Sequence, residues 1–195
     1  MNTFLKAIAL LFLALSLNSC GYNNMVTLEE NTVEAWGNVE TAYQRRNDLV
    51  GNLVKTVQGA ADFERGTLTE VIKARAAATS IHIDPSKITP EQLAEFNKVQ
   101  GGLRGALKSL LMTVERYPDL KANQNFLKLQ DELTSTENQI LTARTRFNEA
   151  VKPYNVTIKK FPAVIYAGWF GFEPKSYFEA TEGADKPVEV NFDFK

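Results

Sequence analysis

Large hydrophobic residues recur every seven positions in the second half of the chain and predict a long helix. The series runs without interruption from residue 126 to residue 161, and a second set of residues follows three places after its members. Alternating large and small side chains along one seam are typical of tightly packed helices. The first set is Phe126, Leu133, Ile140, Phe147, Tyr154 and Phe161, and the second is Leu129, Thr136, Ala143, Ala150 and Thr157.

A second seven-residue series predicts another long helix near the start of the chain, with Trp36, Tyr43, Val50 and Val57 as its members. Two weak points lie along it, one at residues 45–51 and one at residues 59–66. An unbroken helix from 27 to 80 would be about 80 Å long and would extend past its partners. We therefore expect a break near 48–51 with Asp48 as an N-cap, and a kink at Gly51 is the alternative.

The middle of the chain carries the clearest helix start. Thr89, Pro90 and Gln92 match an N-cap, a proline in the first turn and a capping box. Pro118 ends this helix, and Asp119 is expected to cap the next one. The pattern predicts an all-α fold: an antiparallel up-and-down bundle of four long helices over residues 26–160, with an irregular tail. The apolar face of the middle helix comprises Leu93, Phe96, Leu103, Leu107, Leu110, Val114 and Tyr117, with Gln100 as its one polar member.

The first 20 residues have the pattern of a bacterial export signal. The apolar run 7–17 is short for a membrane span, which needs about 20 residues, but has the length of a signal-peptide core. Ser19 and Cys20 follow it and resemble a lipobox, although Asn18 departs from the usual pattern. We expect a signal peptide over 1–19, cleavage between Ser19 and Cys20, lipid on Cys20 and a flexible tether over 20–25. A short transmembrane anchor and a free cysteine are the alternatives.

Charge and scarce residue types exclude several classes of function. Lys and Arg total 22 against 23 Asp and Glu, so the chain has no general attraction for nucleic acid. A single Cys and a single His cannot build a cysteine-rich zinc site or a histidine-bridged metal centre. No Glu-x-x-His motif of a di-iron bundle occurs, and His82 is expected to be solvated in a loop. We predict no metal, no cofactor and no catalytic residue. Glu137 and Arg144 border the seam of one helix, and we expect each to form a salt bridge with a neighbouring helix or to lie at a solvated edge.

The segment 161–172 is apolar throughout and too short to span a bilayer. It either packs across the end of the bundle, inserts at a lipid interface or docks a partner. Beyond it, residues 188–194 alternate as a strand does, without an evident partner strand. The candidate partner or interface contacts are Phe161, Tyr166, Trp169, Phe170 and Phe172.

Several motifs in unchanged order resemble the LemA family. They include RRNDLV at 45–50, YPDLKANQNF at 117–126, LQDELTSTENQI at 129–140 and FNEAV at 147–151. The resemblance implies a bundle, commonly of four helices, exposed outside the cytoplasm on a membrane anchor. It implies no established enzymatic activity, catalytic residue or cofactor. The lipobox, where many relatives keep an uncleaved membrane helix, and Gly51, where a proline is expected, depart from the family pattern.

These features predict a lipid-anchored scaffold or interaction module in the cell envelope, with an envelope protein as its partner and no enzymatic activity. The alternative is a sensor that binds a small apolar ligand between helices near Gly101 to Gly105, where glycines would admit a close neighbour. The pattern does not choose between inner and outer membrane, and a two-sided apolar stripe serves a monomer and a self-associating rod alike.

Overall fold

Helices make up nearly all of the regular structure, which confirms the all-α class. The computed structural model describes the backbone of residues 3–59 and 63–179 and the side chains of 21–59 and 63–179. The strand-like stretch 188–194 lies outside these residues. The elements are α1 (Thr3–Gln58), α2 (Arg65–Ser80), α3 (Pro90–Val114), α4 (Pro118–Lys121), α5 (Gln124–Lys159), α6 (Ala163–Tyr166) and the 3-10 helix η1 (Gly168–Phe170).

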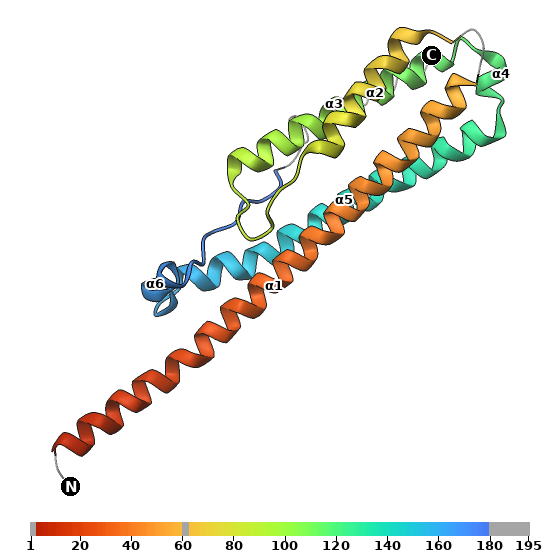
Figure 1. Cartoon of the computed structure of the whole chain (residues 1–195). Helices are drawn as coiled ribbons and strands as arrows, with labels where there is room; N and C mark the ends of the chain where they lie inside the picture. Colours follow the sequence, from red (N-terminus) through yellow and green to blue (C-terminus); the bar gives the residue numbers. More distant parts are fainter. Residues whose placement is uncertain (1–2, 60–62, 180–195) are drawn as a thin grey trace, which may run out of the picture.

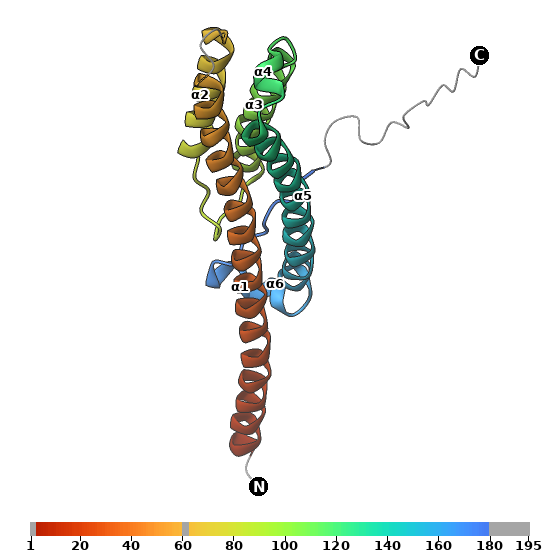
Figure 2. The same cartoon turned by 90° about the vertical axis from the view of Figure 1, so that its right-hand side faces the viewer.

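Two pairs of long helices build an elongated molecule. α1 and α5 lie side by side and share the most extensive interface, and α2 and α3 form a second pair beside the C-terminal half of α1 (Figure 1). Glu29 of α1 contacts Tyr154 of α5, and Arg46 farther along α1 contacts Glu137. The first part of α1 extends past α5 and α6 in both views (Figures 1 and 2).

The expected break near residues 48–51 is wrong, because α1 continues through Gly51 to Gln58. Leu49, Val50 and Leu53 are buried there, so packing holds this turn in the helix. A Cβ at Gly51 would lie 3.2 Å from the guanidinium of Arg75, whose Nε donates to the Asn47 carbonyl at 2.7 Å. The glycine therefore makes room for an α2 side chain within an uninterrupted helix, and the chain leaves α1 at the second weak point.

The start of α1 also differs from expectation. Residues 20–25 were expected to form a flexible tether, but they are helical and continue directly into the rest of α1. Met25 is fully buried against the end of α5 and the segment that follows it. Apolar burial therefore extends the ordered body to within a few residues of Cys20.

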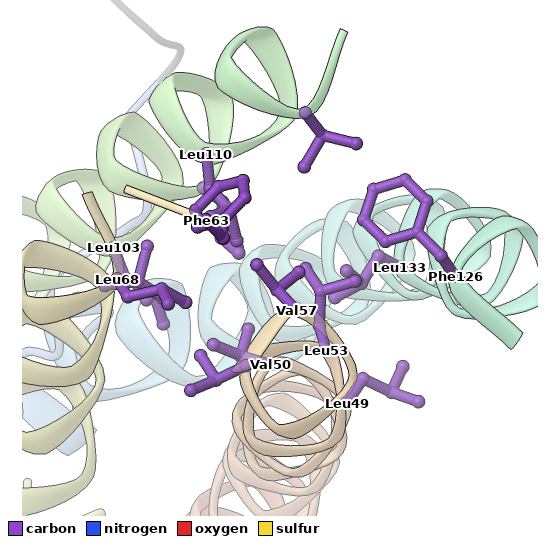
Figure 3. Packing of buried hydrophobic residues seen from close by; sticks show 14 of the residues in the cluster. Leu49, Val50, Leu53, Val57, Phe63, Leu68, Leu103, Leu110, Phe126 and Leu133 are labelled. Atoms are coloured by element: carbon purple, nitrogen blue, oxygen red, sulfur yellow. The ribbon is translucent and has the colours of Figure 1, made fainter. Parts of the chain in front are cut away.

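Buried apolar side chains form three clusters along the molecule. One joins the C-terminal half of α1 to α2, α3 and the start of α5 (Figure 3). The second surrounds Trp36, whose ring centroid lies 5.4 Å from that of Phe147, and the third includes Met25. Both predicted seven-residue series are buried, except that Phe161 is 80% exposed because α5 ends at Lys159.

The helix starts were predicted partly correctly. At the start of α3 the backbone N–H of Gln92 donates to Thr89 Oγ1, and the backbone N–H of Thr89 donates to Gln92 Oε1. These two bonds confirm the capping box. Asp119 does not cap the long helix that follows, because it lies inside the short α4. The cap of α5 is Asn123, whose side chain accepts from two amides of the first turn and so satisfies donors that the helix leaves unpaired.

Candidate functional site

The end of the molecule from which the first part of α1 projects carries α6 and η1 (Figure 1). Aromatic side chains of η1 and of the residues after it pack on α1: the ring centroid of Tyr22 lies 5.0 Å from that of Phe170 and 5.7 Å from that of Phe172. Gly21 lies so close to Tyr166 that an added Cβ would collide with the tyrosine hydroxyl. Segment 161–172 therefore packs across the bundle end through one of its faces.

Several apolar side chains of this segment are exposed. Of the candidate contact residues, Phe161, Trp169 and Phe170 are exposed and Tyr166 is half-buried. We call the exposed set the aromatic surface; it comprises Phe161 (80% exposed), Val164 (52%), Ile165 (54%), Trp169 (82%) and Phe170 (59%).

Phe172 does not belong to the aromatic surface, because it is only 7% exposed and lies in the third apolar cluster. The turn at Gly171, with φ of 82°, reverses the chain just before it, a conformation that glycine adopts without steric cost. The Phe172 amide then donates to the Ala167 carbonyl at 3.0 Å. Backbone geometry thus directs Phe172 inward and leaves Trp169 and Phe170 outside.

Lysines directly precede the aromatic surface, and Glu173 directly follows segment 161–172. Lys159 and Lys160 are exposed immediately before the aromatic surface. Residues 159–172 and 21–28 contain no Asp or Glu. The aromatic surface therefore has cations and no carboxylates among its neighbours in these two segments.

Residues 173–179, here called the strap, run back along α5 and are held by two asparagines. Asn155 donates to the Lys175 carbonyl at 2.7 Å and accepts from the Lys175 amide at 2.9 Å. Asn148 makes the same pair of bonds with Phe178, at 2.8 Å each. Asn148 and Asn155 are seven positions apart in a helix, a rise of about 10.5 Å, and Lys175 and Phe178 are three positions apart in an extended segment, a rise of about 10 Å. The two asparagines therefore have the same spacing as the two backbone groups that they bind.

Sequence reasoning missed this asparagine pair. Its signal was present, because Asn148 and Asn155 directly follow Phe147 and Tyr154, two members of the buried series. A repeated amide beside a buried seam needs hydrogen-bond partners. The pattern alone did not show that an extended segment beyond the bundle supplies them.

Lys175 joins the strap to the rest of the molecule through a buried ammonium group. Its side chain is 1% exposed, and Nζ lies 3.2 Å from Glu29 Oε1 and donates to the carbonyls of Pro85 and Ser86. The hydroxyl of Tyr154 donates to the Glu173 carbonyl at 3.0 Å. Burial and the nearby Glu29 carboxylate raise the pKa of Tyr154, so its phenol stays a neutral donor.

A second buried polar network lies where α1, α3 and α5 meet. Arg46 is 1% exposed and donates to Glu137 Oε1 at 3.0 Å and to the side chain of Gln100, which in turn donates to the Ala78 carbonyl. Arg104 also binds Glu137, at 2.8 Å. Burial tends to raise the pKa of Glu137, but its bonds to Arg46 and its pairing with Arg104 outweigh burial and hold that pKa below the usual value.

Glu137 pairs across helices as expected, with Arg46 of α1 and Arg104 of α3. Arg144 instead lies with its guanidinium carbon 4.5 Å from the centroid of the Phe178 ring and donates to the Glu179 carbonyl. It therefore helps to hold the strap.

A shallow groove of about 590 Å³ runs between α1 and α5. Ala42 and Ala143 are buried along it, and Arg45 and Arg146 contribute the only charged side chains of its lining. The remaining lining residues are amides and hydroxyls, so the groove offers hydrogen-bond donors and positive charge. They are Asn38, Thr41, Ser135, Asn138, Gln139 and Thr142.

The glycines near residue 101 do not form a ligand site between helices. A Cβ added at Gly101, Gly102 or Gly105 would meet nothing within 4 Å, and all three residues are exposed. The expected close approach of a neighbouring helix is therefore wrong, because these glycines face away from the buried side of α3. This finding also overturns the placement of an apolar ligand there.

The described side chains do not form a metal-binding site. No group of three or more His, Cys, Asp or Glu residues within that set lies close enough to hold an ion. His82 is exposed in the loop between α2 and α3, as expected.

The proposed lipidation residue lies at the edge of what the structure describes. Ser19 and Cys20 belong to α1 by their backbone, but their side chains lie outside the described residues. Cys20 directly precedes Gly21, which touches Tyr166. Among the residues searched, no helix contains a stretch both long and apolar enough to cross a membrane.

Comparison with known proteins gives one family and several distant relatives. A family model described as LemA family matches residues 35–192. Magnetosome protein MamQ 1 of Paramagnetospirillum magneticum and magnetosome protein MamQ of Magnetospirillum gryphiswaldense are each 28% identical, over 86% of this chain and 68% of their own. Protein LemA of Metamycoplasma hominis is 26% identical, over 76% of this chain and 62% of its own.

Proposed function

Because this chain belongs to the LemA family, we propose that it is an envelope scaffold held to a membrane outside the cytoplasm by lipid on Cys20. Its antiparallel helices form a rod that binds another envelope protein, and it acts by binding without catalytic chemistry. The observation that carries this proposal is the continuity of α1 from Cys20 to Gln58, which joins the proposed start of the mature chain directly to the bundle.

A continuous helix makes the distance from the anchor predictable. At about 1.5 Å per residue, Thr41 in the α1/α5 groove stands about 30 Å from Cys20 along the axis. Gly21 and Tyr22 pack on segment 161–172, so the start of the mature chain is held against the bundle. A lipid at Cys20 would therefore present the groove at a defined height above the membrane.

The anchor is tested by mass spectrometry of protein extracted from membranes. We expect a chain that begins at Cys20 and carries a diacylglycerol, whose two acyl chains suffice for stable attachment, together with an acyl group on its new amino terminus. The substitution Cys20→Ser should release the protein from the membrane or leave it uncleaved. A native chain with an unmodified Cys20 in the membrane fraction would refute lipid anchoring.

The partner surface proposed is the α1/α5 groove. Its lining contains Arg45 and Arg146 and no carboxylate, which suits a partner segment that carries Asp or Glu. A photoreactive residue at Thr41 should crosslink one identifiable envelope protein in intact cells, whereas the same residue at Lys108, on the exposed face of α3, should not. The change R45E/R146E should abolish that crosslink. Equal crosslinking from both positions would reject the groove as the binding site.

A further inference from the structure

The aromatic surface has no function in the scaffold described so far. We propose that it lies in the headgroup region of the membrane to which α1 is anchored, so that the bundle touches the bilayer through Phe161, Val164, Ile165, Trp169 and Phe170. This inference rests on the proposed membrane anchoring and adds a second point of contact with the lipid.

The chemistry of the surface suits a lipid interface. Trp169 and Phe161 are the two most exposed large apolar side chains of the described residues, at 82% and 80%. Exposed apolar side chains gathered in one short segment suit an interaction site, and aromatic rings are favoured where acyl chains meet headgroups. Two exposed lysines, Lys159 and Lys160, precede the surface, and residues 159–172 hold no carboxylate. Apolar side chains bordered by lysines are the pattern that binds anionic lipid.

The position of the surface identifies its occupant as the membrane. α6 and η1 lie at the end of the bundle from which the first part of α1 projects (Figures 1 and 2). Tyr22, two residues after Cys20, packs its ring against Phe170 of the surface itself. An anchor at Cys20, or the uncleaved apolar run 7–17, would bring the same end of the molecule to the bilayer. The surface therefore meets lipid under either form of anchoring.

The surface is also rigid enough to act as a contact point. Ala163, Ala167 and Phe172 are buried beneath it, and Gly171 closes the turn that holds Phe172 inside. The backbone that carries the exposed side chains is therefore held in place, so that little backbone ordering is needed when the surface enters the interface. A second contact would restrict the tilt of the rod relative to the membrane.

The two tryptophans of the chain provide the test, because Trp36 is 1% exposed in the core and Trp169 is 82% exposed. The full lipid-bearing protein is placed in vesicles of phosphatidylethanolamine and phosphatidylglycerol whose acyl chains carry bromine near the headgroup. We expect bromine to quench roughly half of the wild-type emission, since one of two indoles lies in the interface. In the matched variant Trp169→Phe, bromine should quench almost none of the remaining tryptophan emission, which comes from buried Trp36. Substituting Lys159 and Lys160 by Glu should weaken quenching in these anionic vesicles.

Three outcomes would overturn the inference, and the first two leave the anchor standing. If the protein floats with the vesicles but wild type and Trp169→Phe are quenched equally little, the anchor stands and the interface contact is rejected. A photoreactive group at position 169 that crosslinks a protein in cells, with Trp169 unquenched in vesicles, would assign the surface to a protein partner. A chain that does not float at all would reject anchoring and interface contact together.

Discussion

Replacing Asn155 by alanine should detach the strap from α5 and destabilise the protein substantially. Asn155 is 5% exposed and makes two hydrogen bonds to the backbone of Lys175, at 2.7 and 2.9 Å. The change would leave one buried N–H and one buried C=O without partners, and each such group costs about 1 to 3 kcal/mol. Allowing for partial rehydration of the strap, we expect the free energy of unfolding to fall by about 2 to 4 kcal/mol.

The assay is urea denaturation followed by circular dichroism, combined with amide hydrogen exchange. The amides of Lys175 and Phe178 should lose protection in Asn155→Ala, while amides in the middle of α5 report the global change. Asn138→Ala, on an exposed position of the same helix, serves as the control and should change stability by no more than about 0.5 kcal/mol. If Asn155→Ala also changed the free energy of unfolding by no more than about 0.5 kcal/mol, with the Lys175 amide still protected from exchange, this account of the strap would be refuted.

Three further changes probe the rest of the fold. Glu137→Gln should destabilise the protein at neutral pH. Folding lowers the pKa of the Glu137 carboxyl from 4.5, so its ion pairs stabilise the protein above about pH 4.5 and this stabilisation is lost as the pH falls through the pKa of the folded state. Urea denaturation curves of variant and wild type should therefore converge at low pH. Gly51→Ala should gain less than the roughly 1 kcal/mol expected of an open helix position, and more in an Arg75→Ala background; additive changes would contradict the Arg75 contact. Phe147→Ala should cost about 3 to 5 kcal/mol by thermal or urea unfolding, since its side chain is fully buried, and a loss under 1 kcal/mol would contradict that packing.

The packing seams and the start of α3 were predictable because their causes are local. A seven-residue period places side chains on one side of a helix wherever that helix packs, so Phe126 to Tyr154 were identified as buried without coordinates. The two hydrogen bonds of the capping box join Thr89 and Gln92, which lie within one helical turn of each other. The aromatic segment was also recognised as a unit, but its division into a buried and an exposed face depends on the turn at Gly171.

The amino-acid sequence by itself determined the helical class, the buried seams and the family. Only the tertiary structure decided that α1 passes through Gly51, that Glu137 pairs with Arg46 and Arg104, and that two asparagines bind the strap. The physical reason is the separation along the chain between the residues that interact. A helix period and a cap arise among residues within a few positions of one another, whereas the space beside a glycine or the partner of a buried amide is supplied by segments far away in the chain.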